Sequence, residues 1–222
     1  MSKRVGVVLS GCGYLDGAEI HESVLALISL DRRDAKVRCY APNSDQMHVV
    51  NHLTGEPVPG ERRNVLVESA RIARGQVEDV AKARAADLDA LVLPGGYGAA
   101  KNLSTFAVDG PGCRVDPDVE RLVGEMLDAR KPVGFICIAP AVAAKILEKR
   151  GVGGVQLTIG NDPGTAQALG SLGAKHVACT VGDIVVDADH RVVSTPAYML
   201  AGRIREAAEG IDRLVARVLE LA

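Results

Sequence analysis

Residues 131–147 read KPVGFICIAPAVAAKIL, and this stretch decides the fold that we expect for the chain. Val133 to Ile136 form a short apolar run that is typical of a strand buried on both faces, and Ala139 to Leu147 are strong helix formers. Cys137 lies between them, where the chain must turn sharply. The positive end of the helix dipole favours a thiolate there, so the pattern predicts a nucleophilic cysteine. A buried cysteine that packs as a small hydrophobic residue explains the local sequence equally well.

The composition is that of an ordinary globular protein, and 222 residues suffice for one large α/β domain. Aromatic residues make up only 3% of the chain, so aliphatic side chains must fill the core, which favours parallel strands covered by helices. The net charge of −2 and the few aromatic residues argue against a nucleic-acid partner. The five cysteines fit no zinc or disulfide pattern, which indicates a reducing compartment, the cytoplasm. No segment approaches the length of a membrane span.

Strands and helices alternate along the sequence, which predicts a doubly wound, mostly parallel sheet with helices on both faces. We expect strands at 5–9, 36–40, 89–94, 133–136, 155–159, 178–181, 184–187 and 191–194. Helices are expected at 18–30, 65–73, 77–86, 99–106, 117–129 and 139–147, then near 172 and at the C-terminus. One domain should span residues 1–222, with an excursion at about 43–75 that shapes a site or an interface.

Several features of the sequence fall on the carboxyl edge of this sheet, where ligands of such folds bind. Glu19 and Glu22 are three residues apart and share the face of the first helix, although carboxylates there also simply complement the helix dipole. The pair Gly95–Gly96 follows a strand and either forms a tight turn or exposes N–H groups to an oxyanion. Cys137 lies on the same edge, and Asn161 should join it. This convergence favours a functional cysteine.

Two weaker patterns do not predict a site. The loop Gly11-Cys-Gly13 lacks the third glycine of a dinucleotide-binding motif and the lysine of a phosphate-binding loop. His48 and His52 are spaced for one helix face, but no third ligand lies near them in the sequence, so no metal site is expected.

Three segments of the chain resemble the site segments of the PfpI-like, class I glutamine amidotransferase-like superfamily, which includes the parkinsonism-associated deglycase. They are GAEIHE (17–22), LPGGYGAAKNLS (93–104) and GFICIAP (134–140). The resemblance is closer still to the ElbB-type isoprenoid biosynthesis glyoxalases, and it continues through residues 51–56, 63–68, 183–187 and 195–201. It therefore covers almost the whole chain and implies a flavodoxin-like fold.

The resemblance implies that Cys137 is the nucleophile and that Glu22 hydrogen-bonds its sulfur. The N–H groups of Gly96 and Ile138 match the donors of the oxyanion hole. Members of the group commonly form homodimers, and a cofactor-free glyoxalase activity that needs no glutathione is reported across it. We expect the substrate pocket to include Glu19, Gly95, Tyr97, Asn102 and Asn161.

One departure from the family pattern bears on the chemistry. Many relatives carry a histidine in the loop that here reads TIGND (158–162), where Gly160 and Asn161 cannot act as a base. The hypothesis is therefore a slow conversion of glyoxal or methylglyoxal to a 2-hydroxy acid, with a hemithioacetal on Cys137 and Glu22 as proton shuttle. The alternatives are a thiol redox sensor or interaction module that uses an oxidisable Cys137 and, less favoured, a glutamine amidotransferase.

Overall fold

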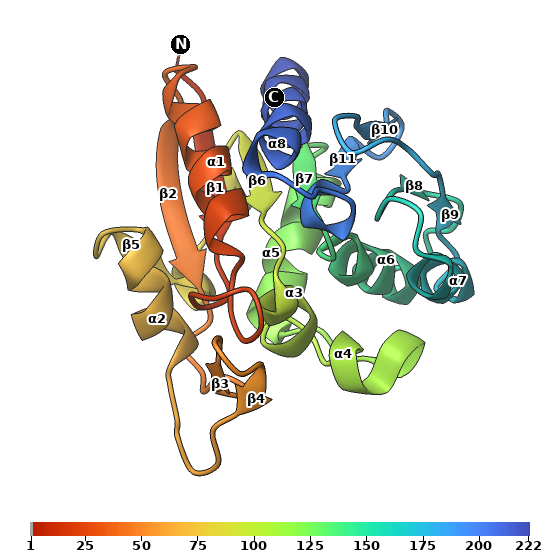
Figure 1. The fold of residues 1–222 in the computed structure, drawn as a ribbon. Helices are drawn as coiled ribbons and strands as arrows, with labels where there is room; N and C mark the ends of the chain where they lie inside the picture. Colours follow the sequence, from red (N-terminus) through yellow and green to blue (C-terminus); the bar gives the residue numbers. More distant parts are fainter. Residues whose placement is uncertain (1) are drawn as a thin grey trace.

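A seven-stranded sheet runs through the centre of the protein in a computed structural model that describes residues 2–222 (Figure 1). Its strands, in the order in which they lie side by side, are β10 (Val185–Asp187), β11 (Val192–Thr195), β7 (Val133–Ile136), β6 (Ala90–Leu93), β1 (Arg4–Val8), β2 (Lys36–Ala41) and β5 (Val77–Asp79). The strand β10 pairs antiparallel with β11, and the other neighbours are parallel. From β2 to β11 the order is that of flavodoxin-like folds. The expected doubly wound, mostly parallel sheet is confirmed.

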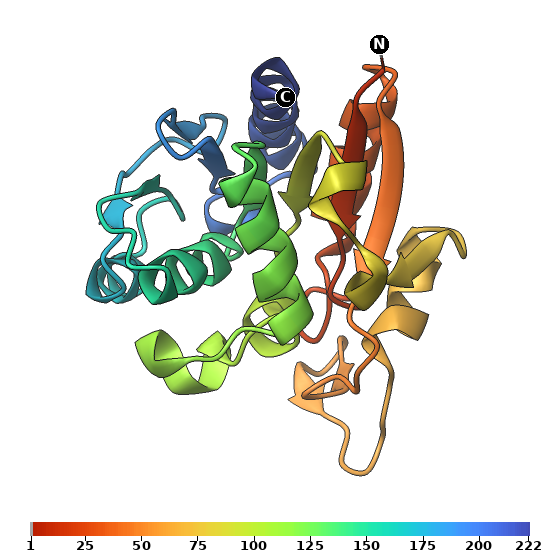
Figure 2. The same cartoon turned by 180° about the vertical axis from the view of Figure 1, so that it is seen from behind.

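Helices cover both faces of the sheet (Figures 1 and 2). One face packs against α1 (Ile20–Asp31), α2 (Val65–Ile72) and α8 (Ile204–Leu221). The other packs against α3 (Tyr97–Lys101), α5 (Pro117–Asp128), α6 (Pro140–Lys149) and α7 (Pro163–Ser171), and the short α4 (Phe106–Asp109) follows α3. Successive side chains of a strand point to opposite faces, so Val92 belongs to the first cluster and its neighbours Leu91 and Leu93 to the second. The central strands β6 and β7 are apolar throughout because both of their faces are buried.

Two small sheets lie outside the central one. The strands β3 (Val50–Asn51) and β4 (Glu56–Pro57) form a hairpin within the expected excursion. The strands β8 (Gln156–Leu157) and β9 (Lys175–His176) pair in parallel beside α7. The strand expected at 178–181 is wrong, because residues 175–176 supply the partner of β8 instead. Cys179, which lies in that expected strand, is half-buried and outside any strand.

The helix expected at 77–86 is also wrong. Val77–Asp79 is the edge strand β5, which pairs with the end of β2, and short 3₁₀ turns follow it. The Asp79 side chain accepts a hydrogen bond from the N–H of Ala81 and so caps the first of these turns. Pairing with a neighbouring strand outweighs the local helical pattern, as is common at sheet edges.

Two searches of residues 2–222 bear on the expected partners. No helix there combines the length and apolar character that a membrane crossing needs. No group of three potential metal ligands is found in the same part of the chain.

Candidate active site

Cys137 occupies a sharp turn at the carboxyl end of β7. Its backbone φ is +62°, in the left-handed region that non-glycine residues rarely adopt, and its N–H donates to the carbonyl oxygen of Thr195 at 2.9 Å. Pro140 begins α6 three residues later. The turn lifts the cysteine out of the strand and places it under a cleft, where 6% of its surface is exposed. This is the strained strand-to-helix turn that the sequence predicts.

Glu22 reaches the cysteine from the first turn of α1. The side chain of Glu19 caps this helix by accepting the N–H of Glu22 at 2.6 Å, which fixes where the helix begins. Glu22 is fully buried and lies with Cys137 against Gly95, and the thiol lowers the pKa of the carboxyl as a hydrogen-bond partner. The structure thus brings together the two residues that the sequence assigns to catalysis.

Four backbone N–H groups surround the pair. Gly95 donates to Oε2 of Glu22 at 2.9 Å, and Tyr198 donates to Oε1 at 3.2 Å. The N–H groups of Gly96 and Ile138, the two expected oxyanion donors, lower the pKa of the Cys137 thiol as hydrogen-bond donors to its sulfur. The hydrogen-bond partners of this pair are therefore backbone amides and each other, and no cationic side chain is among them.

The electrostatics of the pair follow from its burial. Burial, and after it the charge of Glu19, raise the pKa of Glu22 to about 8, against the hydrogen bonds from Tyr198, Cys137 and Gly95, which lower it. Burial and the charge of Glu22 likewise raise the pKa of the Cys137 thiol well above its usual value. The helix dipole favours a thiolate at Cys137, but desolvation outweighs the dipole. The resting state of Cys137 is therefore the thiol. The two groups influence each other, because the charge of Glu22 raises the pKa of the Cys137 thiol and the thiol lowers the pKa of Glu22.

Neighbouring atoms pack so closely against the two glycines after β6 that no larger residue fits there. A Cβ atom on Gly95 would lie 2.4 Å from Cβ of Cys137 and 2.7 Å from Oε2 of Glu22. Gly96 has a φ of +88°, and a Cβ there would lie 2.4 Å from the backbone nitrogen of Glu19. The turn interpretation holds at Gly96, whereas Gly95 is needed because Cys137 and Glu22 approach it closely; the role of the N–H groups toward an oxyanion stays a prediction.

A cleft of about 590 Å³ opens above Cys137. Its walls come from the loops after β1, β6, β7 and β11 together with α3, α4 and the start of α7. The lining residues are Tyr14, Glu19, Gly96, Tyr97, Ala100, Phe106, Ala107, Cys137, Ile138, Asp162, Thr165, Tyr198 and Met199. Glu19 and Tyr97 lie where the sequence places them, and Gly95 lies beneath, against Cys137 and Glu22.

The two asparagines expected in the pocket do not line it. Asn102 donates to the carbonyl oxygens of Ser10 and Asp16, both at 2.8 Å, and accepts the N–H of Met47 at 3.0 Å. Its amide is fully used in tying loops together, so it has no group left for a substrate. Asn161 is exposed beside the cleft, and its neighbour Asp162 takes the lining position because that side chain turns inward to cap α7.

Tyr198 is the main site residue that the sequence does not reveal. It follows β11 on a short 3₁₀ turn, where the left-handed φ of +42° at Ala197 directs its N–H to Glu22. Its hydroxyl lies 2.8 Å from Nδ1 of His21, which is half-exposed at the start of α1. The hints in the sequence are that this segment follows a strand ending at the same edge and that the family resemblance includes residues 195–201, although neither assigns Tyr198 to the site. Among residues 2–222 no histidine lines the cleft, in line with the loop at 158–162.

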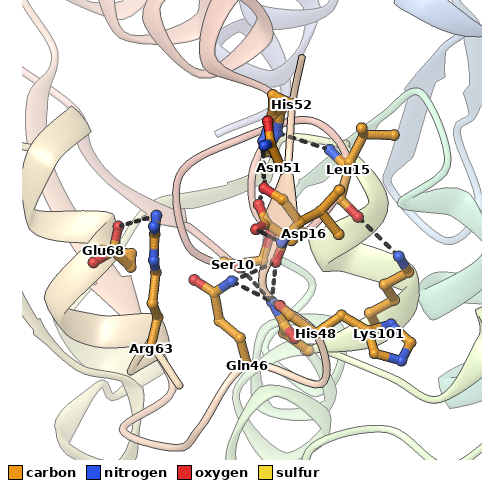
Figure 3. A network of polar contacts seen from close by, with 12 residues as sticks. Ser10, Leu15, Asp16, Gln46, His48, Asn51, His52, Arg63, Glu68 and Lys101 are labelled. Carbon is orange, nitrogen blue, oxygen red and sulfur yellow. Dashed lines mark hydrogen bonds and ion pairs between the residues drawn. The ribbon is translucent and has the colours of Figure 1, made fainter. Parts of the chain in front are cut away.

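The glycine-rich loop after β1 is held by the excursion rather than open to a phosphate. Figure 3 shows His52 accepting the N–H of Leu15, at 3.3 Å, and Lys101 donating to the Leu15 carbonyl oxygen, at 2.8 Å. Gln46 donates to the carbonyl oxygen of Asp16 at 3.1 Å in the same network. These contacts fix the loop that carries Tyr14 into the cleft. The hairpin β3–β4 therefore supports the site from outside.

Sequence comparison finds relatives along nearly the whole chain. The human "Glutamine amidotransferase-like class 1 domain-containing protein 3, mitochondrial" is 49% identical over 227 residues, which cover 98% of this chain and 83% of that protein. The "ES1 protein, mitochondrial" of Danio rerio is 37% identical over 212 residues, which cover 88% of this chain and 77% of that protein. No protein-family model matches the chain.

Structural comparison finds the same fold in solved proteins. A crystal structure of an isoprenoid biosynthesis protein with an amidotransferase-like domain from Ehrlichia chaffeensis superposes with a TM-score of 0.92 at 39% identity, over 99% of each chain. DJ-1beta of Drosophila melanogaster superposes with a TM-score of 0.55 at 22% identity, over 100% of this chain and 96% of that one. The second likeness extends to the fold alone.

Proposed function

Because this chain belongs to the family of glutamine amidotransferase-like class 1 domain proteins that includes the ES1 proteins, we propose that its Cys137–Glu22 pair performs glyoxalase-type chemistry without glutathione. The single observation that carries the proposal is the buried pair itself, held by four backbone N–H groups and no cation. Such a pair can pass one proton between sulfur and carboxylate. The conversion of an α-oxoaldehyde uses this transfer twice, when the thiol adds to the aldehyde and when the thiol is released.

The reaction begins when Glu22 takes the thiol proton and the sulfur of Cys137 bonds to the aldehyde carbon. The aldehyde oxygen receives a proton and the product is a hemithioacetal. The N–H groups of Gly96 and Ile138, which lower the pKa of the Cys137 thiol in the free protein, stabilise the developing alkoxide.

Internal proton transfers then convert the hemithioacetal to a thioester. Glu22 removes the proton from C1 and returns a proton to C2, and the hydroxyl proton on C1 passes to the oxygen on C2, so that C1 is oxidised by two electrons and C2 is reduced by two. Water hydrolyses the thioester and releases the 2-hydroxy acid and the thiol. A carboxyl whose pKa is raised to about 8 suits this role, because both of its protonation states are populated near neutral pH.

The two other functions have less support. Glutamine hydrolysis needs a base beside the cysteine, and none of the described residues that line the cleft is a histidine. A redox sensor needs a low-pKa, accessible thiolate, whereas burial and Glu22 raise the pKa of Cys137. The cysteine–glutamate pair therefore favours aldehyde chemistry.

Turnover of methylglyoxal by variants tests the proposal. Cys137→Ala should abolish formation of the 2-hydroxy acid, and Glu22→Gln should lower kcat by about 10²–10⁴-fold. Cys179→Ala is the matched control, because that half-buried cysteine lies outside the cleft and contacts Thr158. Full turnover by Cys137→Ala would refute the proposal. Peroxide titration of the wild type, with mass spectrometry of all five cysteines, tests the sensor: selective oxidation of Cys137 with negligible turnover would favour it.

Three finer assignments belong to the same proposal. The ElbB-type assignment rests on the segments quoted above and on the 39% identity to the isoprenoid biosynthesis protein. A cytoplasmic location rests on the five free cysteines, and the alternative is the mitochondrial location stated in the relatives' names.

A homodimer is the third of these assignments. It is supported by Ile20, Val24 and Ile28, which form an exposed apolar stripe along α1 at helical spacing. Sedimentation of Val24→Asp tests the dimer: a wild-type dimer that becomes monomeric supports it, and a monomeric wild type refutes it.

A further inference from the structure

Aromatic side chains are concentrated around the reactive cysteine. The chain contains four tyrosines, two phenylalanines and no tryptophan. Four of these six rings line the cleft above Cys137, namely Tyr14, Tyr97, Phe106 and Tyr198. Tyr14 and Tyr97 are half-exposed, although exposing an aromatic ring to water costs free energy. In a protein with so few rings, this arrangement points to a ligand that covers them.

The size of the cleft exceeds what the simplest substrate needs. A volume of about 590 Å³ falls in the range of about 300–1,000 Å³ that is usual for pockets enclosing drug-sized ligands. Methylglyoxal has five non-hydrogen atoms and would leave most of this space to water. The apolar side chains Ala100, Ala107, Ile138 and Met199 lie between the rings, so the space is suited to an apolar group.

The charged residues of the cleft are both acidic. Glu19 lies next to the catalytic pair, and Asp162 lies across the cleft at the start of α7. Hydrogen bonds from Thr165 lower the pKa of Asp162, so it carries a negative charge at neutral pH. The nearby cation Lys101 lies behind Tyr97, with Nζ 5.1 Å from the ring centroid, and donates to the Leu15 carbonyl oxygen. An anionic ligand would meet two carboxylates and no free cation among the described lining residues.

We infer that the cleft selects an uncharged α-oxoaldehyde whose second carbon carries an aromatic or bulky apolar group. The aldehyde carbon meets Cys137, and the ring of the substrate lies between Tyr97 and Phe106. The acidic walls exclude anionic aldehydes and repel the carboxylate of the product, which promotes its release. The inference rests on the proposed function for the aldehyde chemistry, whereas the preference for an aromatic group rests on the lining residues alone.

The first experiment measures the preference without any turnover. Whole protein is treated with phenacyl bromide, iodoacetamide or iodoacetate, each of which forms a thioether with Cys137 as halide leaves. The rate at Cys137, followed by peptide mass spectrometry, is divided by the rate of the same reagent with glutathione. We expect the normalised rate of phenacyl bromide to exceed that of iodoacetamide by about tenfold, and iodoacetate to be slower than iodoacetamide by about tenfold. Equal normalised rates, or iodoacetate as the fastest reagent, would overturn the inference.

Variants assign the preference to the lining residues. Phe106→Ala should lower the phenacyl-to-iodoacetamide ratio by about fivefold, while Val108→Ala, an exposed position on the same helix, should leave it unchanged. Asp162→Asn should raise the iodoacetate rate by about threefold, because asparagine still caps α7 but carries no charge. Tyr97→Ala should lower the same phenacyl-to-iodoacetamide ratio, and because Tyr97 is half-exposed, removing its ring does not disturb the core. Ratios that none of these variants changes would contradict the inference.

The second experiment compares kcat/KM for phenylglyoxal and methylglyoxal. We expect phenylglyoxal to be preferred by at least about tenfold, with both activities lost in Cys137→Ala. Turnover that depends on Cys137 but shows no preference for phenylglyoxal refutes the inference and leaves the proposed function standing. An aromatic preference in alkylation without turnover of either aldehyde refutes the proposed function and supports the selectivity of the cleft.

Discussion

The two ends of α1 hold carboxylates in opposite environments. At its start, Glu22 is fully buried and receives hydrogen bonds from backbone N–H groups, and its pKa is raised to about 8. At its end, Arg33 forms a bidentate ion pair with Asp212 of α8, at 2.7 and 2.9 Å, and Ser29 adds a third hydrogen bond at 2.6 Å. The pKa of Asp212 is lowered to about 2.

The difference teaches what each end of the helix contributes. A guanidinium stabilises a carboxylate that stays partly hydrated, so the ion pair fastens α1 to α8 and stabilises the fold. Backbone amides alone do not compensate for the full burial of a charge, so Glu22 costs stability whenever it is ionised. Because of that cost, Glu22 still binds a proton near neutral pH, where the proposed catalysis uses it.

The largest expected effect is on the pH dependence of stability. The pKa of Glu22 is about 8 in the folded protein and ordinarily 4.5. Between these values the unfolded chain releases this proton and the folded chain keeps it, so wild-type stability falls as pH rises, by on the order of 4 kcal/mol. Glu22→Gln should lack this fall in urea unfolding at pH 5 and pH 8.5. The exposed Glu61→Gln serves as control, and parallel profiles for Glu22→Gln and the wild type would contradict the prediction.

A methyl group at Gly95 tests how closely the site is packed. The Cβ of Gly95→Ala would lie 2.4 Å from Cβ of Cys137 and 2.8 Å from the carbonyl oxygen of Ile136. We expect a loss of about 3 kcal/mol in the free energy of unfolding and a loss of turnover. Gly170→Ala, in α7 with no neighbour within 4 Å, should leave stability unchanged or raise it by about 0.5 kcal/mol. Equal effects of the two substitutions would show that the site tolerates movement.

Asn102→Ala separates a structural role from a role in binding. The substitution leaves the carbonyl oxygens of Ser10 and Asp16 and the N–H of Met47 without this partner, so we expect a loss of about 2 kcal/mol. Because Asn102 does not line the cleft, KM for the preferred aldehyde should change less than twofold. A raised KM with unchanged stability would show that Asn102 contributes to substrate binding, as the sequence predicts.

The smallest effect is expected at the other end of α1. The pKa of Asp212 is lowered from 3.8 to about 2, so its ion pair stabilises the protein above pH 3.8 and loses this contribution as the pH falls toward 2. Half of the side chain is exposed, and screening limits the loss in Asp212→Asn to about 1 kcal/mol at pH 7. This loss should shrink at pH 3 and in high salt, opposite to the pH trend of Glu22. A loss that grows toward acid pH would break the comparison.

Local sequence patterns predicted much of the fold and the centre of the site. The apolar run before Cys137 and the helix formers after it specify a strand and a helix through interactions within a few residues, and both are confirmed. The spacing of Glu19 and Glu22 and the Gly95–Gly96 pair placed a carboxylate and backbone donors at one edge, because parallel strands bring their carboxyl ends together.

The sequence failed where partners come from distant segments. The edge strand at Val77–Asp79 exists because β2 lies beside it, so its local pattern resembled a helix. The asparagines Asn102 and Asn161 follow site motifs, yet neither faces the cleft, since side-chain direction depends on which loops pack around it. Tyr198 donates its N–H to a carboxylate 176 residues away, and no local signal encodes such a contact.

The sequence by itself therefore determined the alternation of strands and helices and the sharp turn at Cys137, which follow from short-range sterics and from the geometry of parallel sheets. The choice of Glu22 as the partner of Cys137 came from the resemblance of residues 17–22 to the site segment of the family. Only the tertiary structure decided that the pKa of Cys137 is raised and that aromatic side chains line the cleft. Both depend on desolvation, which is set by every segment packed around a group and not by its neighbours in the chain.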